Sequence, residues 1–156
     1  GSEIMTTTPP SAPPGSLPTL RPILIIEDNP MDLDLTVRAF QRRRIANPIE
    51  VARDGQEAIE CIARWDAGAM TPALVLLDLK LPKVDGMEVL LQLKSHPLYR
   101  TIPVVVLTTS AVDRDVQTAY QNGANSYIVK PVNFEKFVEV AAQINLYWSV
   151  LNQLPG

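Results

Sequence analysis

Five short apolar runs recur along the chain, and longer amphipathic segments separate them. Residues 73–78 (Ala-Leu-Val-Leu-Leu-Asp) are the clearest example, because every position before the final acid is apolar. A continuous apolar run of this length is typical of a strand that is buried on both faces, as in a parallel sheet. The predicted strands are residues 23–27, 48–52, 73–78, 102–108 and 126–129.

The segments between these runs carry helix signals. Short polar residues that cap helix N-termini precede them, namely Asn29 (followed by Pro30), Asp54, Asp85 and Asn133. Apolar residues then recur at helical spacing: Leu33, Val37 and Phe40; Ala58, Ile59, Ile62 and Ala63; Met87, Leu90 and Leu91; Val112, Val116, Ala119 and Tyr120. Strands that alternate with helices in this way predict an α/β fold, with five (βα) units in a doubly wound parallel sheet.

Polar side chains with related chemistry follow four of the predicted strands. The carboxyl ends of parallel strands meet at one edge of the sheet, where open α/β folds bind their ligands. Acids, a hydroxyl group and an amine are therefore expected to lie together. The residues concerned are Glu27, Asp28, Asp78, Thr108 and Lys130.

This set of side chains fits a magnesium and phosphoryl site. Mg²⁺ prefers oxygen ligands and is usually held by one or two carboxylates together with a phosphate, which Asp28 and Asp78 can provide directly and Glu27 directly or through water. Asp78 can attack phosphorus as a nucleophile, while Lys130 and Thr108 supply a cation and a hydroxyl donor for the phosphoryl oxygens. Each residue alone has an ordinary structural explanation, but their convergence on one edge favours the functional one.

Five motifs together resemble the receiver domain of two-component response regulators: Glu27-Asp28-Asn29, residues 77–82 (Leu-Asp-Leu-Lys-Leu-Pro), Asp85-Gly86, residues 107–110 (Leu-Thr-Thr-Ser) and Lys130-Pro131. The resemblance covers residues 22 to about 150. It implies a flavodoxin-like strand order, 2-1-3-4-5, and a phosphoryl group passed from a histidine kinase to Asp78.

The resemblance also implies a role for each site residue. Glu27 and Asp28 would be the acidic metal pair for Mg²⁺, with Asp78 and the backbone carbonyl of Lys80 as further ligands. Thr108 and Lys130 would contact the phosphoryl group, and Tyr127 would be the aromatic residue that turns inward as Thr108 moves. The Lys130–Pro131 bond would be cis.

Two features refine this resemblance. Glu27 stands where the family more often has Asp, and Lys80 and Ser110 occupy positions that tune the lifetime of the phosphoryl group. Residues 103–110, 145–148 and 154–155 are similar to small response regulators that partner bacterial and cyanobacterial phytochromes. A bacteriophytochrome is therefore one candidate for the kinase partner.

The last predicted helix runs from Asn133 to about residue 153 and has more apolar residues than a sheet-covering face needs. One stripe faces the predicted sheet: Phe134, Phe137, Ala141, Ile144, Trp148 and Leu151. A second stripe, with Val140, Tyr147, Val150 and Leu154, predicts a protein interface, most simply a homodimer. The proline-rich segment of residues 1–20 is expected to contribute to it, and residues 21–154 to form the receiver.

Composition narrows the possible environments. The net charge of −3 gives no electrostatic case for nucleic-acid binding, and no apolar run is long enough for a membrane span. Cys61 is the only cysteine, so no intramolecular disulfide is possible and a reducing cytoplasm is expected. Gly1-Ser2 is typical of an expression-tag remnant, and no fused output domain is expected after the last helix.

Three alternatives use the same fold. A small aspartyl-phosphate hydrolase or phosphatase would need a second acid two residues after its nucleophile, where this chain has Lys80. A flavin or nucleotide carrier would need an uncharged phosphate loop in place of Glu27-Asp28. A pseudo-receiver interaction module would keep all the required side chains without using them. A phosphoacceptor that does not turn over external substrates is the favoured interpretation.

Overall fold

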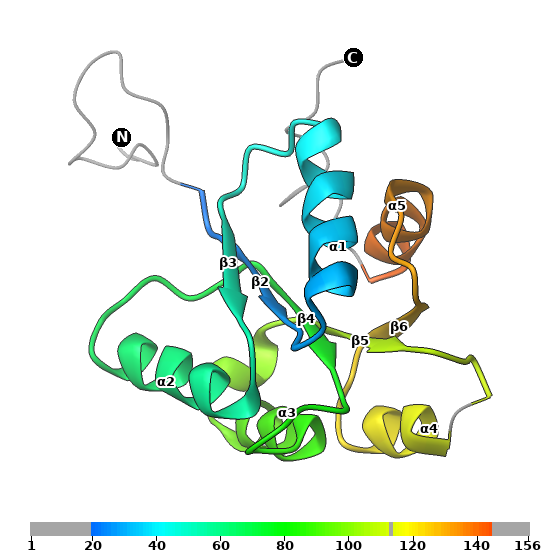
Figure 1. The fold of residues 1–156 in the computed structure, drawn as a ribbon. Helices are drawn as coiled ribbons and strands as arrows, with labels where there is room; N and C mark the ends of the chain where they lie inside the picture. Colours follow the sequence, from blue (N-terminus) through cyan, green and yellow to red (C-terminus); the bar gives the residue numbers. More distant parts are fainter. Residues whose placement is uncertain (1–19, 113, 145–156) are drawn as a thin grey trace, which may run out of the picture.

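The structure, a computed structural model, describes residues 20–112 and 114–144, and its elements alternate between strand and helix (Figure 1). The strands are β2 (Ile23–Ile26), β3 (Ile49–Ala52), β4 (Leu74–Asp78), β5 (Val104–Thr108) and β6 (Ser126–Val129). The helices are α1 (Pro30–Arg42), α2 (Gly55–Asp66), α3 (Gly86–Ser95), α4 (Arg114–Gln121) and α5 (Phe134–Gln143), with a short 3₁₀ helix, η1 (Tyr99–Thr101), before β5.

The five strands form one parallel sheet in the order β3-β2-β4-β5-β6. Counted along the chain this is the order 2-1-3-4-5, so the predicted fold is confirmed. Every residue of β2, β4 and β5 is buried, whereas the edge strands β3 and β6 include partly exposed positions. The continuous apolar runs of the three inner strands therefore reflect cover on both faces of the sheet.

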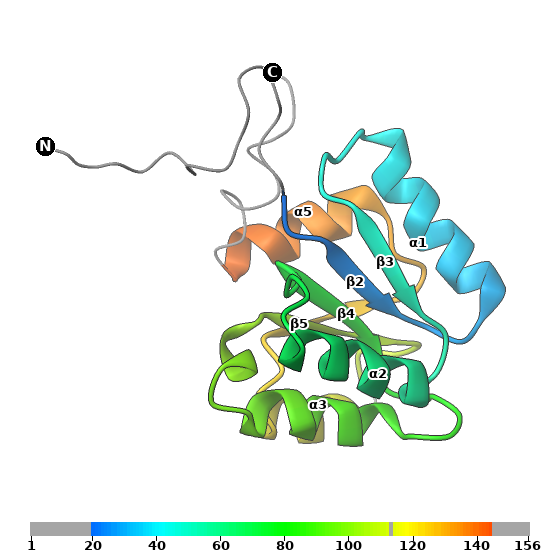
Figure 2. The ribbon, with the colours of Figure 1, turned by 90° about the vertical axis from the view of Figure 1, so that its left-hand side faces the viewer.

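Helices cover both faces of the sheet (Figure 2), and each face has its own apolar core. Alternate residues of one strand serve different cores, because successive side chains point to opposite faces. In β2, Ile23 and Ile25 pack with residues of α1 and α5, whereas Leu24 and Ile26 pack with residues of α2 and α3. The inner strands are thus anchored from both sides, which fixes the positions of the residues that follow them.

The predicted caps begin four of the helices. The Asn29 side chain accepts hydrogen bonds from the backbone N–H groups of Met31 (2.9 Å) and Asp32 (3.1 Å), which fixes the first turn of α1 directly after β2. Asp54, Asp85 and Asn133 cap α2, α3 and α5 in the same way. The capping chemistry predicted from the sequence is therefore confirmed.

The structure corrects two helical faces. Val112 was expected on the buried face of the fourth helix, but α4 begins at Arg114 and the Val112 side chain is 89% exposed. Leu91 was grouped with the apolar face of α3, yet it is 42% exposed, while Val89, Leu90 and Leu93 fill the core. A helical face is chosen by the surface on which the helix packs, which spacing alone does not reveal.

The last helix also differs from its prediction. Val140 was assigned to a second, interface-forming stripe, but it is buried in the core beside Phe137 and Ala141, so this assignment is wrong. α5 ends at Gln143 with Ile144 as its C-cap. The predicted continuation to about residue 153, the remaining interface residues Tyr147, Val150 and Leu154, and the N-terminal segment before residue 20 lie outside the described residues.

Glycines allow the loop between β4 and α3 to pack closely against its neighbours. A Cβ atom on Gly86 would overlap the carbonyl oxygen of Asp78, and one on Gly55 would overlap the carbonyl oxygen of Val84. The Gly86 N–H group also donates to the Leu79 carbonyl at 3.0 Å. The loop that follows Asp78 is thus held between the first residues of two helices.

The Gly86→Ala substitution tests this close packing. Alanine normally stabilises a helix relative to glycine, but here the added methyl group should destabilise the protein by about 1–3 kcal/mol through overpacking against β4. Urea denaturation of Gly86→Ala and of Ser95→Ala, an exposed control on the same helix, measures the difference. Equal or greater stability of the Gly86 variant would show that the loop has room to relax.

Candidate phosphoryl and metal site

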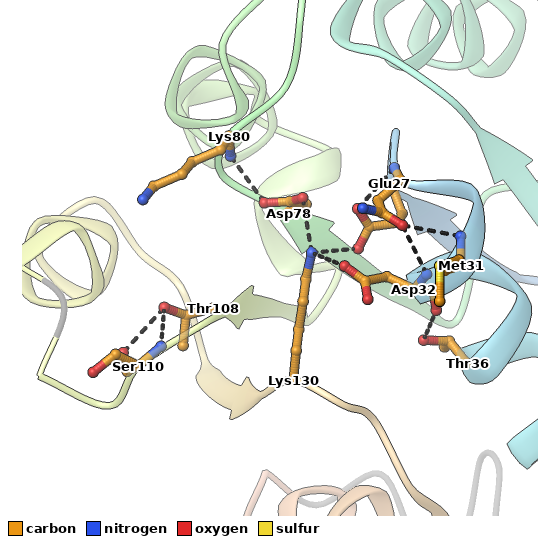
Figure 3. Close-up of polar contacts among 10 residues, drawn as sticks. Glu27, Met31, Asp32, Thr36, Asp78, Lys80, Thr108, Ser110 and Lys130 are labelled. Atoms are coloured by element: carbon orange, nitrogen blue, oxygen red, sulfur yellow. Dashed lines mark hydrogen bonds and ion pairs between the residues drawn. The ribbon is translucent and has the colours of Figure 1, made fainter.

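The polar residues predicted to converge lie at the carboxyl edge of the sheet (Figure 3). Ile26 of β2 pairs with Leu77 of β4, so the next residues, Glu27 and Asp78, lie side by side. On the other side of β4, the Lys130 N–H group donates to the Thr108 carbonyl at 2.7 Å, which places Lys130 just beyond β6. The sheet reverses its winding direction between β2 and β4, which is where ligands bind in such folds.

The Lys130 ammonium group occupies the centre of this arrangement. Its Nζ atom lies 2.8 Å from Glu27 Oε1, 3.0 Å from Asp78 Oδ2 and 3.1 Å from an oxygen of Asp32. The Lys130 side chain is only 12% exposed. A nearly buried ammonium group needs compensating charge, and these carboxylates supply it from the ends of two strands and the first turn of α1.

Asp78 is fixed through both of its carboxylate oxygens. Oδ2 accepts a hydrogen bond from Lys130, and Oδ1 accepts one from the Lys80 backbone N–H group at 2.9 Å. The side chain of Lys80 extends away from the carboxylate (Figure 3). Asp78 is therefore oriented by a cation on one side and by its own loop on the other.

The environment shifts the pKa values of Glu27 and Lys130 in the same direction. Burial, together with the neighbouring Asp78 carboxylate, raises the pKa of Glu27 from 4.5 to about 7, although Lys130 opposes this shift. Burial alone would lower the pKa of Lys130, but its hydrogen bonds to Glu27, Asp78 and Asp32 outweigh burial and raise it. Lys130 is thus held in its charged form among the carboxyl groups of Glu27, Asp32 and Asp78.

The residues present fit a divalent cation with oxygen ligands. Oxygen atoms of Glu27, Asp28 and Asp78 lie within 4.8 Å of one another, and Asp28 is the exposed member of this cluster. Glu27 Oε1 is buried and faces the Lys130 ammonium group at 2.8 Å. A buried carboxylate oxygen next to two other acids matches the hard, anionic donor set that Mg²⁺ and Mn²⁺ take.

Comparison with known proteins identifies the family. Residues 23–142 match the response regulator receiver domain. The chain belongs to the response regulator receiver family. This receiver is 46% identical over 135 residues to the probable methanogenesis regulatory protein FilR2 of Methanothrix harundinacea, a match that covers 86% of this chain and 87% of FilR2.

Solved structures of response regulators resemble the receiver closely. The bacteriophytochrome response regulator AtBRR is 45% identical with a TM-score of 0.77, and the match covers 86% of this chain and 99% of AtBRR. The Mn²⁺-bound form of response regulator Rcp1 is 34% identical with a TM-score of 0.68, covering 87% of this chain and 99% of that one. Phytochrome response regulators are thus among the close relatives of this receiver.

Thr108 contacts Ser110 in its own loop, and Tyr127 contacts the neighbouring helix α4. The Thr108 hydroxyl group donates to the Ser110 carbonyl at 3.1 Å and accepts from the Ser110 N–H group at 3.3 Å. Half-buried Tyr127 on β6 meets Tyr120 of α4 edge to face, with ring centroids 6.2 Å apart. The described structure therefore has the Thr108 hydroxyl bonded to its own loop, with Tyr127 packed against the neighbouring helix.

The Lys130–Pro131 bond is cis, in agreement with the resemblance. A small cleft next to Lys130 is lined by Asp78, Lys80, Thr108 and Lys130, together with the exposed Asp115 at the start of α4. Asp115 was not among the predicted site residues. Its approach to the cleft depends on how α4 packs on the sheet, which local sequence does not indicate.

Sequence reasoning also missed Asp32, which contacts Lys130 as directly as Asp78 does. The available signal was its place in the first turn of a helix that begins immediately after the acidic pair. Such a turn necessarily lies at the ligand-binding edge, but an acid there is equally explained by the helix dipole.

Among the described residues, no helix combines the length and apolar character needed to cross a bilayer.

The pKa of Glu27 predicts a pH-dependent stability of the metal-free receiver. The pKa of Glu27 is about 7 in the folded protein, above the ordinary value of 4.5 that applies in the unfolded chain. The folded protein therefore binds a proton at Glu27 more tightly than the unfolded chain does. The contribution of Glu27 to the free energy of unfolding should be complete below about pH 4.5 and lost as the pH rises through about 7.

Urea denaturation in EDTA at several pH values between these limits measures this slope. The Glu27→Gln variant, which cannot titrate at this position, should show a shallower dependence than the parent protein. Identical slopes for the two proteins would contradict the raised pKa.

Proposed function

We propose that this receiver accepts a phosphoryl group on Asp78 from the phosphohistidine of a histidine kinase. The observation that carries the proposal is the Asp78 carboxylate, which lies 3.0 Å from the Lys130 ammonium group and within the acidic cluster. An Asp78 oxygen forms a bond to phosphorus as the P–N bond to the histidine breaks. The imidazole leaves with the electron pair of that bond and takes up a proton.

Glu27, Asp28 and Asp78, with the backbone carbonyl of Lys80, would hold Mg²⁺ next to the phosphoryl group. When bound, the cation neutralises charge on the phosphoryl oxygens and on the acids around Asp78. The 4.8 Å cluster of carboxylate oxygens supports this assignment, as does the Mn²⁺ bound by the relative Rcp1. Lys130 would contact a phosphoryl oxygen from the side opposite the Lys80 loop.

Thr108 and Tyr127 would report the phosphoryl group to the surface. Thr108 would exchange its hydrogen bonds to Ser110 for one to a phosphoryl oxygen, and Tyr127 would turn inward as the Thr108 loop moves. Tyr127 is half-buried and packs on exposed Tyr120, so its rotation would reshape the surface that α4 and β6 share. Lys80 and Ser110 would tune how long the phosphoryl group persists.

The relatives support a sensor histidine kinase as the phosphoryl donor, but their names point to different input signals. AtBRR is named for a bacteriophytochrome, which supports a phytochrome kinase as the partner of this receiver. FilR2 is named for the regulation of methanogenesis. We place the protein in the cytoplasm, where the transmitter domains of histidine kinases act, and we assign it no turnover of external substrates because Lys80 replaces the acid that a phosphatase would need.

The Asp78→Asn substitution tests the proposed acceptor. The parent protein, incubated with radiolabelled acetyl phosphate and Mg²⁺, should acquire hydroxylamine-sensitive label, and Asp78→Asn should acquire none because an amide cannot form the acyl phosphate. Lys130→Ala should retain weak labelling, but the Tyr127 side chain should no longer turn inward on phosphorylation. The matched control is Asp34→Asn on exposed α1 residue Asp34, which pairs with Arg38, and it should be labelled like the parent.

Equal labelling of the parent protein and Asp78→Asn would place the acceptor elsewhere. If Mg²⁺ binds but neither the parent protein nor any variant is labelled, the result would favour a pseudo-receiver that works through its surface alone.

We also propose that the receiver forms a homodimer through its C-terminal region. The support is the apolar sequence of Tyr147, Val150 and Leu154, with a contribution from the proline-rich segment at the N-terminus. Light scattering after size-exclusion chromatography, with and without beryllofluoride and Mg²⁺, should give about twice the monomer mass. A monomeric mass at tens of micromolar in both conditions would exclude the dimer.

A further inference from the structure

The contacts of Lys130 separate its carboxylate partners into two groups. Glu27 and Asp78 belong to the cluster whose oxygens could ligate a cation, whereas Asp32 is not a member of that cluster. Any group that draws on the oxygens of Glu27 and Asp78 therefore competes with Lys130 for them. The Asp32 carboxylate lies 3.1 Å from Lys130 Nζ. It would remain bonded to Lys130 when Glu27 and Asp78 bind another group.

Hydrogen bonds fix the backbone of Asp32 in the first turn of α1. The Asp32 N–H group donates to the Asn29 side chain at 3.1 Å, and its carbonyl oxygen accepts the Thr36 hydroxyl group at 3.0 Å. Asp32 thus lies in a capped first turn directly after β2, and its side chain is 32% exposed. A lysine side chain has four rotatable bonds and is costly to order, so a fixed acceptor outside the metal cluster has a clear use.

We propose that Asp32 is a positioning residue that keeps the Lys130 ammonium group beside Asp78 when Glu27 and Asp78 are engaged elsewhere. This proposal rests on the proposed phosphoacceptor function of Asp78. Asp32 touches neither the cation nor the phosphoryl group in this role, and it acts only through Lys130. Losing it should lower the fraction of time for which the ammonium group is in place and so slow phosphoryl transfer to Asp78.

Asp32→Asn is the test substitution, because the amide keeps the shape of the side chain and removes its charge. The rate of labelling of Asp78 by acetyl phosphate and Mg²⁺ should fall about three- to tenfold, which lies in the lower part of the range for the loss of one directly coupled contact. Asp32→Glu, which retains the charge, should recover part of the rate. Asp34→Asn, on the same helix and away from Lys130, is the control and should label at the parent rate.

A double-mutant cycle separates positioning from a general effect on α1. Asp32→Asn should have little further effect on labelling in a Lys130→Ala background, because the group through which it acts is absent. The same cycle, measured as the shift of the urea midpoint in EDTA, should show that the two substitutions are coupled in the metal-free protein as well. This second readout does not depend on phosphorylation.

The outcomes distinguish this inference from the proposed function. If Asp32→Asn slows labelling equally with and without Lys130, or leaves it unchanged in the parent background, the positioning role is wrong while Asp78 remains the acceptor. If the parent protein is not labelled at Asp78, the proposed function fails. If the shifts of the urea midpoint caused by the two substitutions are then also additive, Asp32 and Lys130 are not coupled and the positioning role is wrong as well.

Discussion

The site depends on one ammonium group that must balance several carboxylates in a small, partly buried volume. Lys130 contacts Glu27, Asp32 and Asp78, while Asp28 stands at the open side of the cluster. Grouped acids in a medium of low dielectric are tolerated when cations meet them, and removing the Lys130 ammonium group would leave uncompensated buried charge. Burial and the neighbouring Asp78 carboxylate raise the pKa of Glu27, although Lys130 opposes this shift. A divalent cation bound at this cluster would add positive charge in the form that phosphoryl chemistry uses.

The fold brings these charges together without long loops. Glu27 and Asp28 directly follow β2, Asp78 ends β4, Lys130 directly follows β6, and Asp32 lies in the first turn of α1 after β2. The inner strands β2 and β4 are buried throughout, and α1 is anchored by its buried residues Leu33, Thr36 and Phe40, so the close-packed core holds the polar groups in place. The loop after Asp78 is further restrained by close contacts at Gly55 and Gly86. Electrostatic repulsion among the acids is thus opposed by apolar packing in the layers beneath them.

Much of this arrangement could be predicted from the sequence because it follows from local chemistry. Apolar runs ending in an acid, a hydroxyl residue or a lysine placed Asp78, Thr108 and Lys130 at the correct edge, and the caps at Asn29 and Asp54 fixed where helices begin. The failures concern tertiary packing. Val140 lies in the core and Val112 is exposed, because the docking of α5 and the start of α4 are set by neighbouring elements. The contact between Asp32 and Lys130 joins residues 98 positions apart, so no local pattern announces it.

The division of the interior into two apolar cores has a consequence for how such a protein can change. The sheet lies between the two cores, so repacking of α1 and α5 against one face involves few of the side chains that α2 and α3 use on the other. Substitutions in the two layers should therefore combine with nearly independent effects on stability. A chain built in this way can acquire a new recognition surface on one side while the opposite side, and the charged edge that both support, keeps its geometry.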